Sequence, residues 1–307
     1  MGKAGGIDIG GTKIEASVFD DDWNAIATHR VITPRVSYPA LVAAVAEQAK
    51  WLDEQSTVKE MPIGIGIPGL HNAQSGFAFT ANLPATGHTF RADLNKAIGR
   101  DVVFGNDCDL FAFSEAVLGA GKDHETVFGL ILGTGIGGGV CYGESLIQTL
   151  NSAAGEVGHL SISGALINEF DLPILLCGCG RHGCYETLAA GPGLARLSKL
   201  VTGQNLETSD VAAKAAAGDD GAKQVMEIWR RLVAALIGDL QVTIDPDCIV
   251  LGGGLSNIPD VADFVADGLP EVLLRESTPP LVVIAKYGDS SGTRGAALAA
   301  VMERNKS

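Results

Sequence analysis

The segment GIDIGGTK at residues 6–13 joins an alternating strand pattern to a glycine turn. Ile7 and Ile9 lead into the two glycines, and apolar residues alternate again over residues 14–18. A second segment, GLILGTGIGGG at residues 129–139, repeats this order of strand, glycine turn and strand. The repeat predicts two duplicated domains that open in the same way.

Strand and helix patterns alternate along the rest of the chain, which predicts an α/β fold with mixed sheets. Apolar spacing predicts further strands at 62–67, 102–104, 127–132, 140–142, 248–251 and 282–285, and helices at 37–55, 109–118, 222–242 and 294–304. We expect an N-terminal lobe over residues 1–118 and a C-terminal lobe over 119–292. The last helix, within residues 293–307, is expected to return to the first lobe.

Length and net charge limit the number of domains and the classes of binding partner that this chain can have. The 307 residues suit two domains of roughly 150 residues each. Lys and Arg number 22 against 36 Asp and Glu, and the net charge of −14 disfavours partners such as nucleic acid or an anionic membrane. Glycines interrupt the most apolar stretch, so no membrane span is expected. The strand pattern starts at once and leaves no room for a signal peptide, which favours a cytoplasmic protein.

The chain has 40 glycines, and they gather at the ends of apolar runs. Four such places are residues 10–11, 64–69, 133–139 and 252–254. Glycine after a strand permits a sharp turn and close approach of a ligand to the backbone. The four places together predict one ligand site lined by backbone.

The first glycine turn has the chemistry of a phosphate site. Gly10 and Gly11 offer bare N–H groups, Thr12 a hydroxyl and Lys13 an ammonium, which suits the outer phosphates of a nucleotide. Asp8, at the strand end, could hold a water bound to Mg²⁺. The alternative is an ordinary hairpin turn in which Asp8 is incidental.

The second glycine turn contains the spacing G-x-G-x-x-G. Its candidate phosphate-binding residues are Gly133, Thr134, Gly135, Gly137 and Gly138. A dinucleotide-binding site requires a helix next, whereas Val140 and Tyr142 continue an extended pattern. We therefore predict a hairpin-type phosphate loop, and the sequence has no G-x-x-x-x-G-K-[ST] P-loop.

Asp107 follows the predicted strand at 102–104 and Asn106, where a strand delivers side chains into a site. Phosphoryl transfer to a sugar needs alignment, Mg²⁺ and a base near the attacking hydroxyl. Asp107 is a candidate for that base. From local sequence alone, however, the favoured role of the Asn-Asp pair is an Asx cap for the helix at 109–118.

Three of the six cysteines, Cys177, Cys179 and Cys184, fall within eight residues. A cytosolic chain disfavours disulfides, and three thiolates approach a tetrahedral Zn²⁺ site that lacks one ligand. His182 is the local candidate for that ligand. The alternative is a set of reduced cysteines in a glycine-rich loop.

These motifs, in this order, resemble the ROK family of sugar kinases. The likeness comprises both glycine loops, Asn-Asp at 106–107, EVGH at 156–159, the cysteines, and later segments at 245–246, 252–256 and 288–296. It implies an actin-like, RNase H-like duplicated two-domain ATPase fold with ATP in an interdomain cleft. It also implies a homodimer.

The segments at 81–85, 91–94 and 177–184 resemble family members that phosphorylate the 6-hydroxyl of N-acetylglucosamine. Fructo-, manno- and glucokinases of the same family are the nearest alternatives. Sugar-sensing repressors in the family carry a helix-turn-helix before the first glycine loop. Here only residues 1–5 precede that loop, and the charge is −14, which disfavours DNA binding.

The resemblance also implies roles for individual residues. Asp107 would be the general base, Gly253 and Gly254 would contact the nucleotide, and His159 would complete a structural zinc site with the three cysteines. The sugar ligands would be Asn82, Asn106, Asp107, Glu156, His159 and Glu186. The Trp that many members place shortly after the Asn-Leu pair is absent from residues 85–88.

Overall fold

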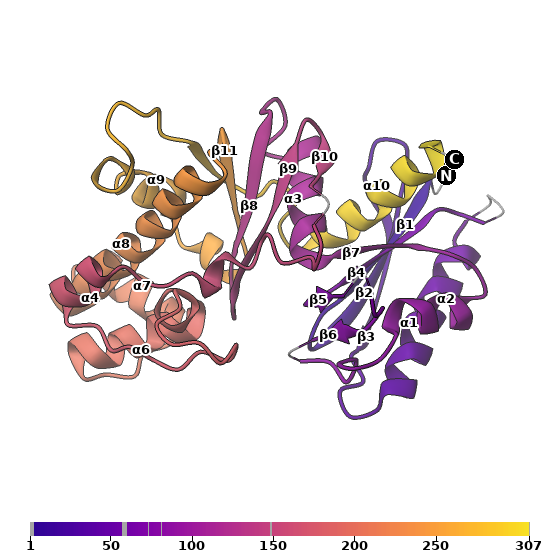
Figure 1. Ribbon diagram of the computed structural model, residues 1–307, viewed down its shortest axis with the longest axis horizontal. Coiled ribbons are helices and arrows are strands. Elements are labelled where there is room, and N and C mark those ends of the chain that lie inside the picture. The colour runs from indigo at the N-terminus through magenta and orange to yellow at the C-terminus, as the bar shows by residue number, and fades with distance from the viewer. Residues whose placement is uncertain (1–2, 57–59, 73, 81, 148, 307) are drawn as a thin grey trace. The chain divides into compact units, whose positions relative to one another are not determined.

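The structure is a computed structural model that describes residues 3–56, 60–72, 74–80, 82–147 and 149–306. The chain divides into two compact units, each with its own sheet and core (Figure 1). Unit 1 comprises Met1–Leu118, Glu144–Gly155 and Asp289–Ser307, and unit 2 comprises Gly119–Gly143 and Glu156–Gly288. The predicted α/β fold class is confirmed.

The sheet of unit 1 has the strand order β3-β2-β1-β4-β7. Its strands are β1 (Ala4–Ile9), β2 (Lys13–Phe19), β3 (Ala25–Ile32), β4 (Ile63–Ile67) and β7 (Val103–Asn106). The first three strands are antiparallel, whereas β1, β4 and β7 run parallel. Small paired strands β5 (Leu70–His71) and β6 (Ala78–Phe79) follow β4 in the chain.

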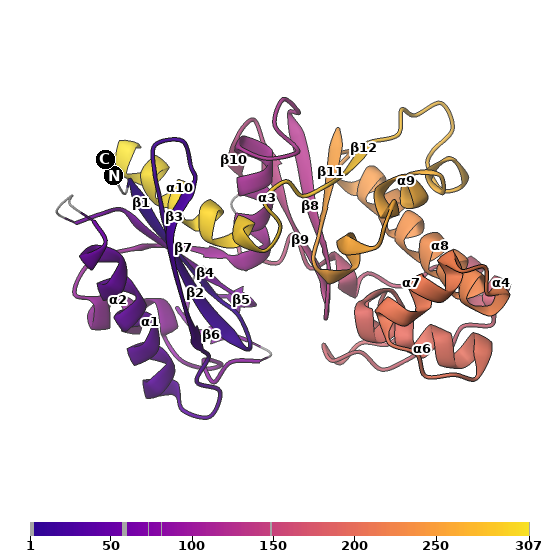
Figure 2. The same cartoon turned by 180° about the vertical axis from the view of Figure 1, so that it is seen from behind.

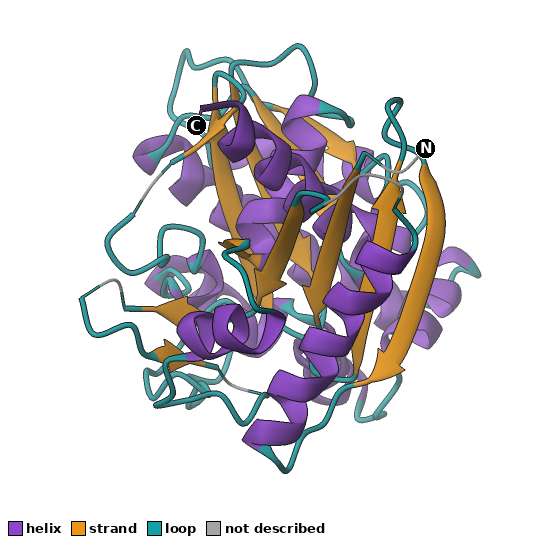
Figure 3. Cartoon of the chain, turned by 90° about the vertical axis from the view of Figure 1, so that its right-hand side faces the viewer, coloured by secondary structure: helices purple, strands orange, loops and turns teal. Residues whose placement is uncertain are grey.

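Helices of unit 1 pack in two pairs (Figure 2). Figure 3 distinguishes helices from strands by colour. Helix α1 (Tyr38–Glu54) contacts α2 (Phe90–Ile98), and their apolar residues share a core with those of the sheet. Helix α3 (Asp107–Val117) packs against α10 (Ser291–Lys306), and α10 lies on β1 and β4. The helix that ends the chain is therefore part of the first unit.

Glycines in β1 and β4 let α10 lie directly on the sheet. A Cβ atom added to Gly6 would lie 1.8 Å from the Thr293 carbonyl oxygen, and one on Gly64 would lie 1.9 Å from that of Ala296. The interpretation of Gly64 as part of a ligand-lining cluster is therefore wrong. This glycine is needed for close packing between backbone and backbone.

We expect Gly64→Ala to lower the free energy of unfolding by about 1–3 kcal/mol, because the added methyl group would clash with the backbone of α10. Denaturant titration of the wild type and the variant measures the change. Gly164→Ala is the matched control, since a Cβ at that position meets nothing within 4 Å. Equal stability of Gly64→Ala and the control variant would contradict the packing account.

The sheet of unit 2 repeats the plan of unit 1. Its strands β9 (Ile136–Tyr142), β8 (Thr126–Leu132), β11 (Cys248–Gly252) and β12 (Leu281–Ile284) lie side by side in that order. The β8–β9 pair is antiparallel, and β8, β11 and β12 are parallel, as are β1, β4 and β7. Strand β10 (Ser145–Leu146) follows β9 in the chain. Because a strand and not a helix follows the glycine turn, the rejection of a dinucleotide-binding fold is confirmed.

Helix α8 (Asp220–Thr243) is the centre of the helical layer of unit 2 (Figure 1). Around it lie α4 (Gly164–Phe170), α5 (Glu186–Ala189), α6 (Gly191–Thr202), α7 (Thr208–Ala216) and α9 (Val261–Ala266). Trp229 of α8 is buried, and its Nε1 donates a hydrogen bond of 2.8 Å to the Ala189 carbonyl oxygen. Within the described ranges, every helix is too short or too polar to cross a bilayer.

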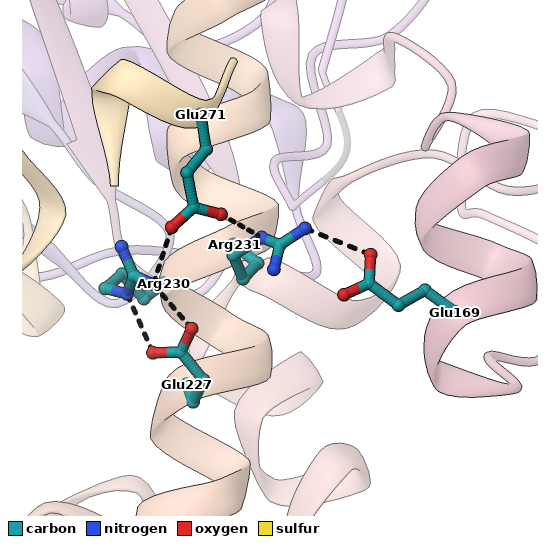
Figure 4. A network of polar contacts seen from close by, with 5 residues as sticks. All are labelled: Glu169, Glu227, Arg230, Arg231 and Glu271. Atoms are coloured by element: carbon teal, nitrogen blue, oxygen red, sulfur yellow. Dashed lines mark hydrogen bonds and ion pairs between the residues drawn. The ribbon is translucent and has the colours of Figure 1, made fainter. Parts of the chain in front are cut away.

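A network of charged side chains fixes α8 to its neighbours (Figure 4). Glu271 contacts both Arg230, at 3.6 Å, and Arg231, at 3.3 Å. Arg230 Nε also donates to Glu227 at 2.8 Å, and Arg231 contacts Glu169 of α4 at 3.0 Å. Individual exposed ion pairs contribute little, but this connected set aligns three segments of unit 2.

Candidate functional site

The glycine turn between β1 and β2 is a closed hairpin. Gly10 N donates to the Lys13 carbonyl oxygen at 2.9 Å, and the Thr33 hydroxyl donates to the Gly10 carbonyl oxygen at 2.7 Å. Thr33 N donates to the Thr12 carbonyl oxygen at 3.0 Å. The Lys13 ammonium lies 3.3 Å from the buried Glu15 carboxylate, which also accepts a hydrogen bond of 2.6 Å from Arg30 Nε.

The Asp8 carboxylate lies beside the first turn of α10. A Cβ atom on Gly292 would lie 3.3 Å from Asp8 Cγ, and one on Gly66 would lie 3.3 Å from Asp8 Oδ1. A helix N-terminus favours a negative charge. Asn82 lies against the glycine turn between β1 and β2, because a Cβ on Gly11 would lie 3.3 Å from Asn82 Cβ. Ala81, which precedes it in the quoted motif, lies outside the described residues.

Asn106, and not Asp107, is the N-cap of α3. Its Oδ1 accepts hydrogen bonds from Cys108 N at 2.8 Å and Asp109 N at 3.1 Å. Its Nδ2 donates to the Gly69 carbonyl oxygen at 3.0 Å. The prediction of an Asx cap is therefore confirmed, but Asn106 supplies it, and the Asp107 carboxylate is not needed as the N-cap.

Asp107 is the first residue of α3, directly after β7. Burial raises the pKa of its carboxyl group, and a hydrogen bond of 2.9 Å from Cys108 N opposes that shift. Asn106 pairs with Ile67 on the neighbouring parallel strand, and Gly66 pairs with Asp8 on the next. Asp107 and Asp8 therefore belong to the same edge of the sheet, where the parallel strands end. A carboxylate with a raised pKa suits general-base catalysis near neutral pH.

In unit 2, the turn between β8 and β9 is held by backbone hydrogen bonds. Gly133 N donates to the Gly135 carbonyl oxygen at 3.0 Å, and Gly191 N donates to that of Gly133 at 2.8 Å. Gly253 adopts a φ of 81°, and a Cβ there would lie 2.5 Å from the Leu132 carbonyl oxygen. The glycine segments after β8 and β11 are thus in direct contact.

A cavity of about 1460 Å³ opens beside these segments within unit 2. Gly133, Thr134 and Gly254 line it, as expected for nucleotide-binding residues. Residues that sequence reasoning missed also line it, including Gly191, Arg196, Thr208, Ala212, Met226 and Leu255. Leu255 belongs to the glycine segment at 252–256, and Met226 to the helix predicted at 222–242. The others come from α6 and α7, which match no motif; only the glycine-proline start of α6 could have indicated a turn there.

Gly137 and Gly138 lie in β9 and do not line this cavity. A Cβ atom on Gly138 would lie 2.4 Å from the ring of Phe128 on β8. Packing between the strands therefore explains this glycine, although it fits the G-x-G-x-x-G spacing.

The cysteine cluster forms a compact set of donors with His159. One ligand atom from each of His159, Cys177, Cys179 and Cys184 lies within 4.8 Å of the others. Cys177 Sγ is 3.5 Å from His159 Nδ1, and Cys179 Sγ is 3.8 Å from Cys184 Sγ. Tetrahedral Zn²⁺ with Zn–S bonds of 2.3 Å requires ligands separated by about 3.8 Å. The donor set therefore fits Zn²⁺, and among the described residues the cluster does not include His182.

Two left-handed glycines shape the metal-binding turn. Gly180 has a φ of 86° and Gly183 a φ of 72°, values that residues with a side chain adopt rarely. Cys177 N donates to the Arg181 carbonyl oxygen at 2.8 Å, which closes the turn. Burial and the adjacent sulfurs raise the pKa of Cys184 to about 12, so a bound cation would be needed to stabilise the thiolate form.

The predicted sugar ligands of unit 2 surround this cluster. His159 Nε2 lies 3.5 Å from Glu156 Oε2, while its Nδ1 faces Cys177. One imidazole can therefore serve the cluster and face Glu156 at the same time. Glu186 Oε2 accepts a hydrogen bond of 3.0 Å from Ile136 N in the glycine turn.

The family model for the ROK family matches residues 4–303 of this chain. N-acetyl-D-glucosamine kinase from Yersinia pseudotuberculosis is 40% identical over 302 residues, which cover 97% of this chain and 99% of the relative. The Escherichia coli protein of the same name is 40% identical over 295 residues, 95% of this chain and 97% of the relative.

Solved structures give the same family. The ROK hexokinase from Thermus thermophilus superposes with a TM-score of 0.86 at 31% identity, covering 99% of each chain. A ROK family glucokinase from Streptomyces griseus, in complex with glucose and AMPPNP, has a TM-score of 0.79 at 29% identity and covers 97% of this chain and 99% of its own. This chain belongs to the ROK family and has the fold of its sugar kinases.

Proposed function

We propose that this protein is a kinase that transfers the γ-phosphoryl group of ATP to the 6-hydroxyl of N-acetyl-D-glucosamine. The products are N-acetylglucosamine 6-phosphate and ADP. The single observation that carries the proposal is Asp107, a partly exposed acid at the end of β7 whose pKa is raised and which does not serve as the N-cap of α3. The two relatives at 40% identity, which bear the name N-acetyl-D-glucosamine kinase, support the choice of substrate.

In this proposal Asp107 accepts the proton of the attacking hydroxyl, and a Mg²⁺ ion associated with ATP offsets charge at the phosphates. Asp8 is the carboxylate that would hold a water on that ion. Asn82, Asn106, Glu156, His159 and Glu186 are the proposed sugar ligands. The nucleotide contacts are proposed at residues 10–13, 133–138 and 253–254.

Zn²⁺ in the cluster of His159, Cys177, Cys179 and Cys184 would be structural, because four protein ligands leave no open position. When bound, it supplies no chemistry to the transfer and fixes the loop that carries the cysteines. Since Glu156 and Glu186 stand three and two residues from ligands, their placement would depend on that loop. A homodimer and a cytoplasmic location are part of the same proposal, supported by the family resemblance.

The proposal is tested by ADP release from Mg-ATP with N-acetylglucosamine, N-acetylmannosamine, glucose, mannose and fructose. We expect kcat/KM to be highest for N-acetylglucosamine, by about 10-fold or more, because a site built to hydrogen-bond one polar group discriminates against substrates that lack it. A preference for a plain hexose, as the hexokinase and glucokinase likenesses would suggest, retains the kinase and corrects the substrate. No turnover with any sugar would overturn the proposed function.

A further inference from the structure

The Glu186 carboxylate faces two functional segments of unit 2 at once. Its Oε2 accepts the hydrogen bond of 3.0 Å from Ile136 N, in the turn that contributes to the cavity. Its Oε1 lies 3.8 Å from the sulfur of Cys177, a member of the metal-binding cluster. One side chain thus spans the distance between the glycine turn and the cluster.

The glycine turn is packed closely against both segments. A Cβ atom on Gly135 would lie 2.6 Å from Glu186 Oε2, which places the carboxylate directly against the turn. On the other side, a Cβ on Gly158 would lie 2.4 Å from the Ile136 carbonyl oxygen. Gly158 is adjacent to His159, so Ile136 is held between two segments that carry cluster residues.

A second path of hydrogen bonds runs from the cluster to the cavity wall. The Thr187 hydroxyl donates to the Cys184 carbonyl oxygen at 2.7 Å. Arg196, which lines the cavity, donates from a terminal guanidinium nitrogen to the Thr187 carbonyl oxygen at 2.8 Å. Both paths pass through the segment at 184–187, of which Glu186 is the part that contacts the turn.

We infer that Glu186 is a positioning residue that couples occupancy of the metal cluster to nucleotide affinity. This rests on the proposed nucleotide and zinc roles. A cation at the cluster would take the sulfurs of Cys177 and Cys184 as ligands, and the thiol hydrogen that Cys177 directs at the carboxylate would be lost. Ligation of Cys184 would fix the segment at 184–187, and with it the position of the Glu186 carboxylate against Ile136. Such coupling is reciprocal: nucleotide binding strengthens metal binding by the same factor.

Calorimetric titration of Mg-ADP, without sugar, into zinc-loaded and zinc-depleted protein tests the coupling. We expect depletion of the wild type to weaken ADP binding by about 5-fold or more, the lower end of known couplings. In Glu186→Ala the ADP affinity should no longer depend on zinc. Glu186→Gln should restore part of the dependence, since its amide oxygen can still accept from Ile136 N.

The controls separate the possible failures. Asp267→Ala removes an exposed carboxylate elsewhere in unit 2 and should retain the zinc dependence of the wild type. Should Glu186→Ala fail to fold by circular dichroism, Glu186→Gln, which keeps the shape of the side chain, is the variant to measure, and its zinc dependence should be smaller than that of the wild type. Zinc-independent ADP binding in the wild type, or an unchanged dependence in folded Glu186→Ala, would overturn the inference. Absence of ADP binding from zinc-loaded wild type would instead overturn the proposed function.

Discussion

Asp107→Asn should reduce kcat by about 100- to 10,000-fold, the usual contribution of a general base, while sugar affinity stays close to that of the wild type. Asparagine has nearly the same shape as aspartate, and its Oδ1 can still accept the hydrogen bond from Cys108 N. The substitution therefore removes the proton acceptor and leaves α3 and its Asn106 cap in place.

Steady-state kinetics and direct sugar titration measure the two effects separately. Asp109→Asn is the matched control, because it neutralises another acid in the first turn of the same helix. Near-normal turnover by Asp107→Asn would exclude the base role, and an equal loss in Asp109→Asn would point to damage to the helix.

The pH dependence of kcat/KM, compared between the wild type and Asp107→Asn, is a second test of the base role. Asp107 must be ionised to accept a proton, and burial raises its pKa. As the pH falls through that raised pKa, kcat/KM should fall, at a pH above the pKa of about 3.9 for an exposed aspartate. The residual activity of Asp107→Asn should lack this limb.

Periodicity predicted the elements with the strongest local signals. The helix expected at 37–55 is α1, and the strand expected after each glycine turn is β2 or β9. Helices α6 and α7 were missed, although they supply a large part of the cavity wall. Their sequences contain no motif, and only their packing on α8 gives them a place in the site.

The candidate site was predictable where chemistry is local and unpredictable where it depends on packing. The spacing of Cys177, Cys179 and Cys184 indicates a metal-binding turn by itself. Local spacing offers His182 as the fourth ligand, whereas pairing of Ser161 with Cys184 brings His159 to the cluster from 18 residues before Cys177. The clustering of glycines in the sequence could not show that the turn at 133–135 lies at the cavity whereas Gly64 permits close packing of α10 on the sheet.

The purified protein should contain about one Zn²⁺ per chain, as a closed four-ligand site requires, and Cys184→Ser should lose most of it. Cys184 is buried, and its sulfur lies 3.8 Å from that of Cys179, so the variant removes a ligand from the interior of the cluster. Binding of a structural zinc contributes to folding, and the melting temperature of the variant should fall accordingly.

Elemental analysis and thermal melts, with and without a chelator, measure the metal content and its contribution to stability. Cys108→Ser is the matched control, because Cys108 lies on α3 of unit 1, outside the cluster, and should keep the metal. Chelation should lower the melting temperature of the wild type and of Cys108→Ser, but leave that of Cys184→Ser nearly unchanged, since its site is already empty. A metal-free wild type that is folded and active would show that the four donors need no cation. The turn would then be held by its own hydrogen bonds, such as that from Cys177 N to the Arg181 carbonyl oxygen.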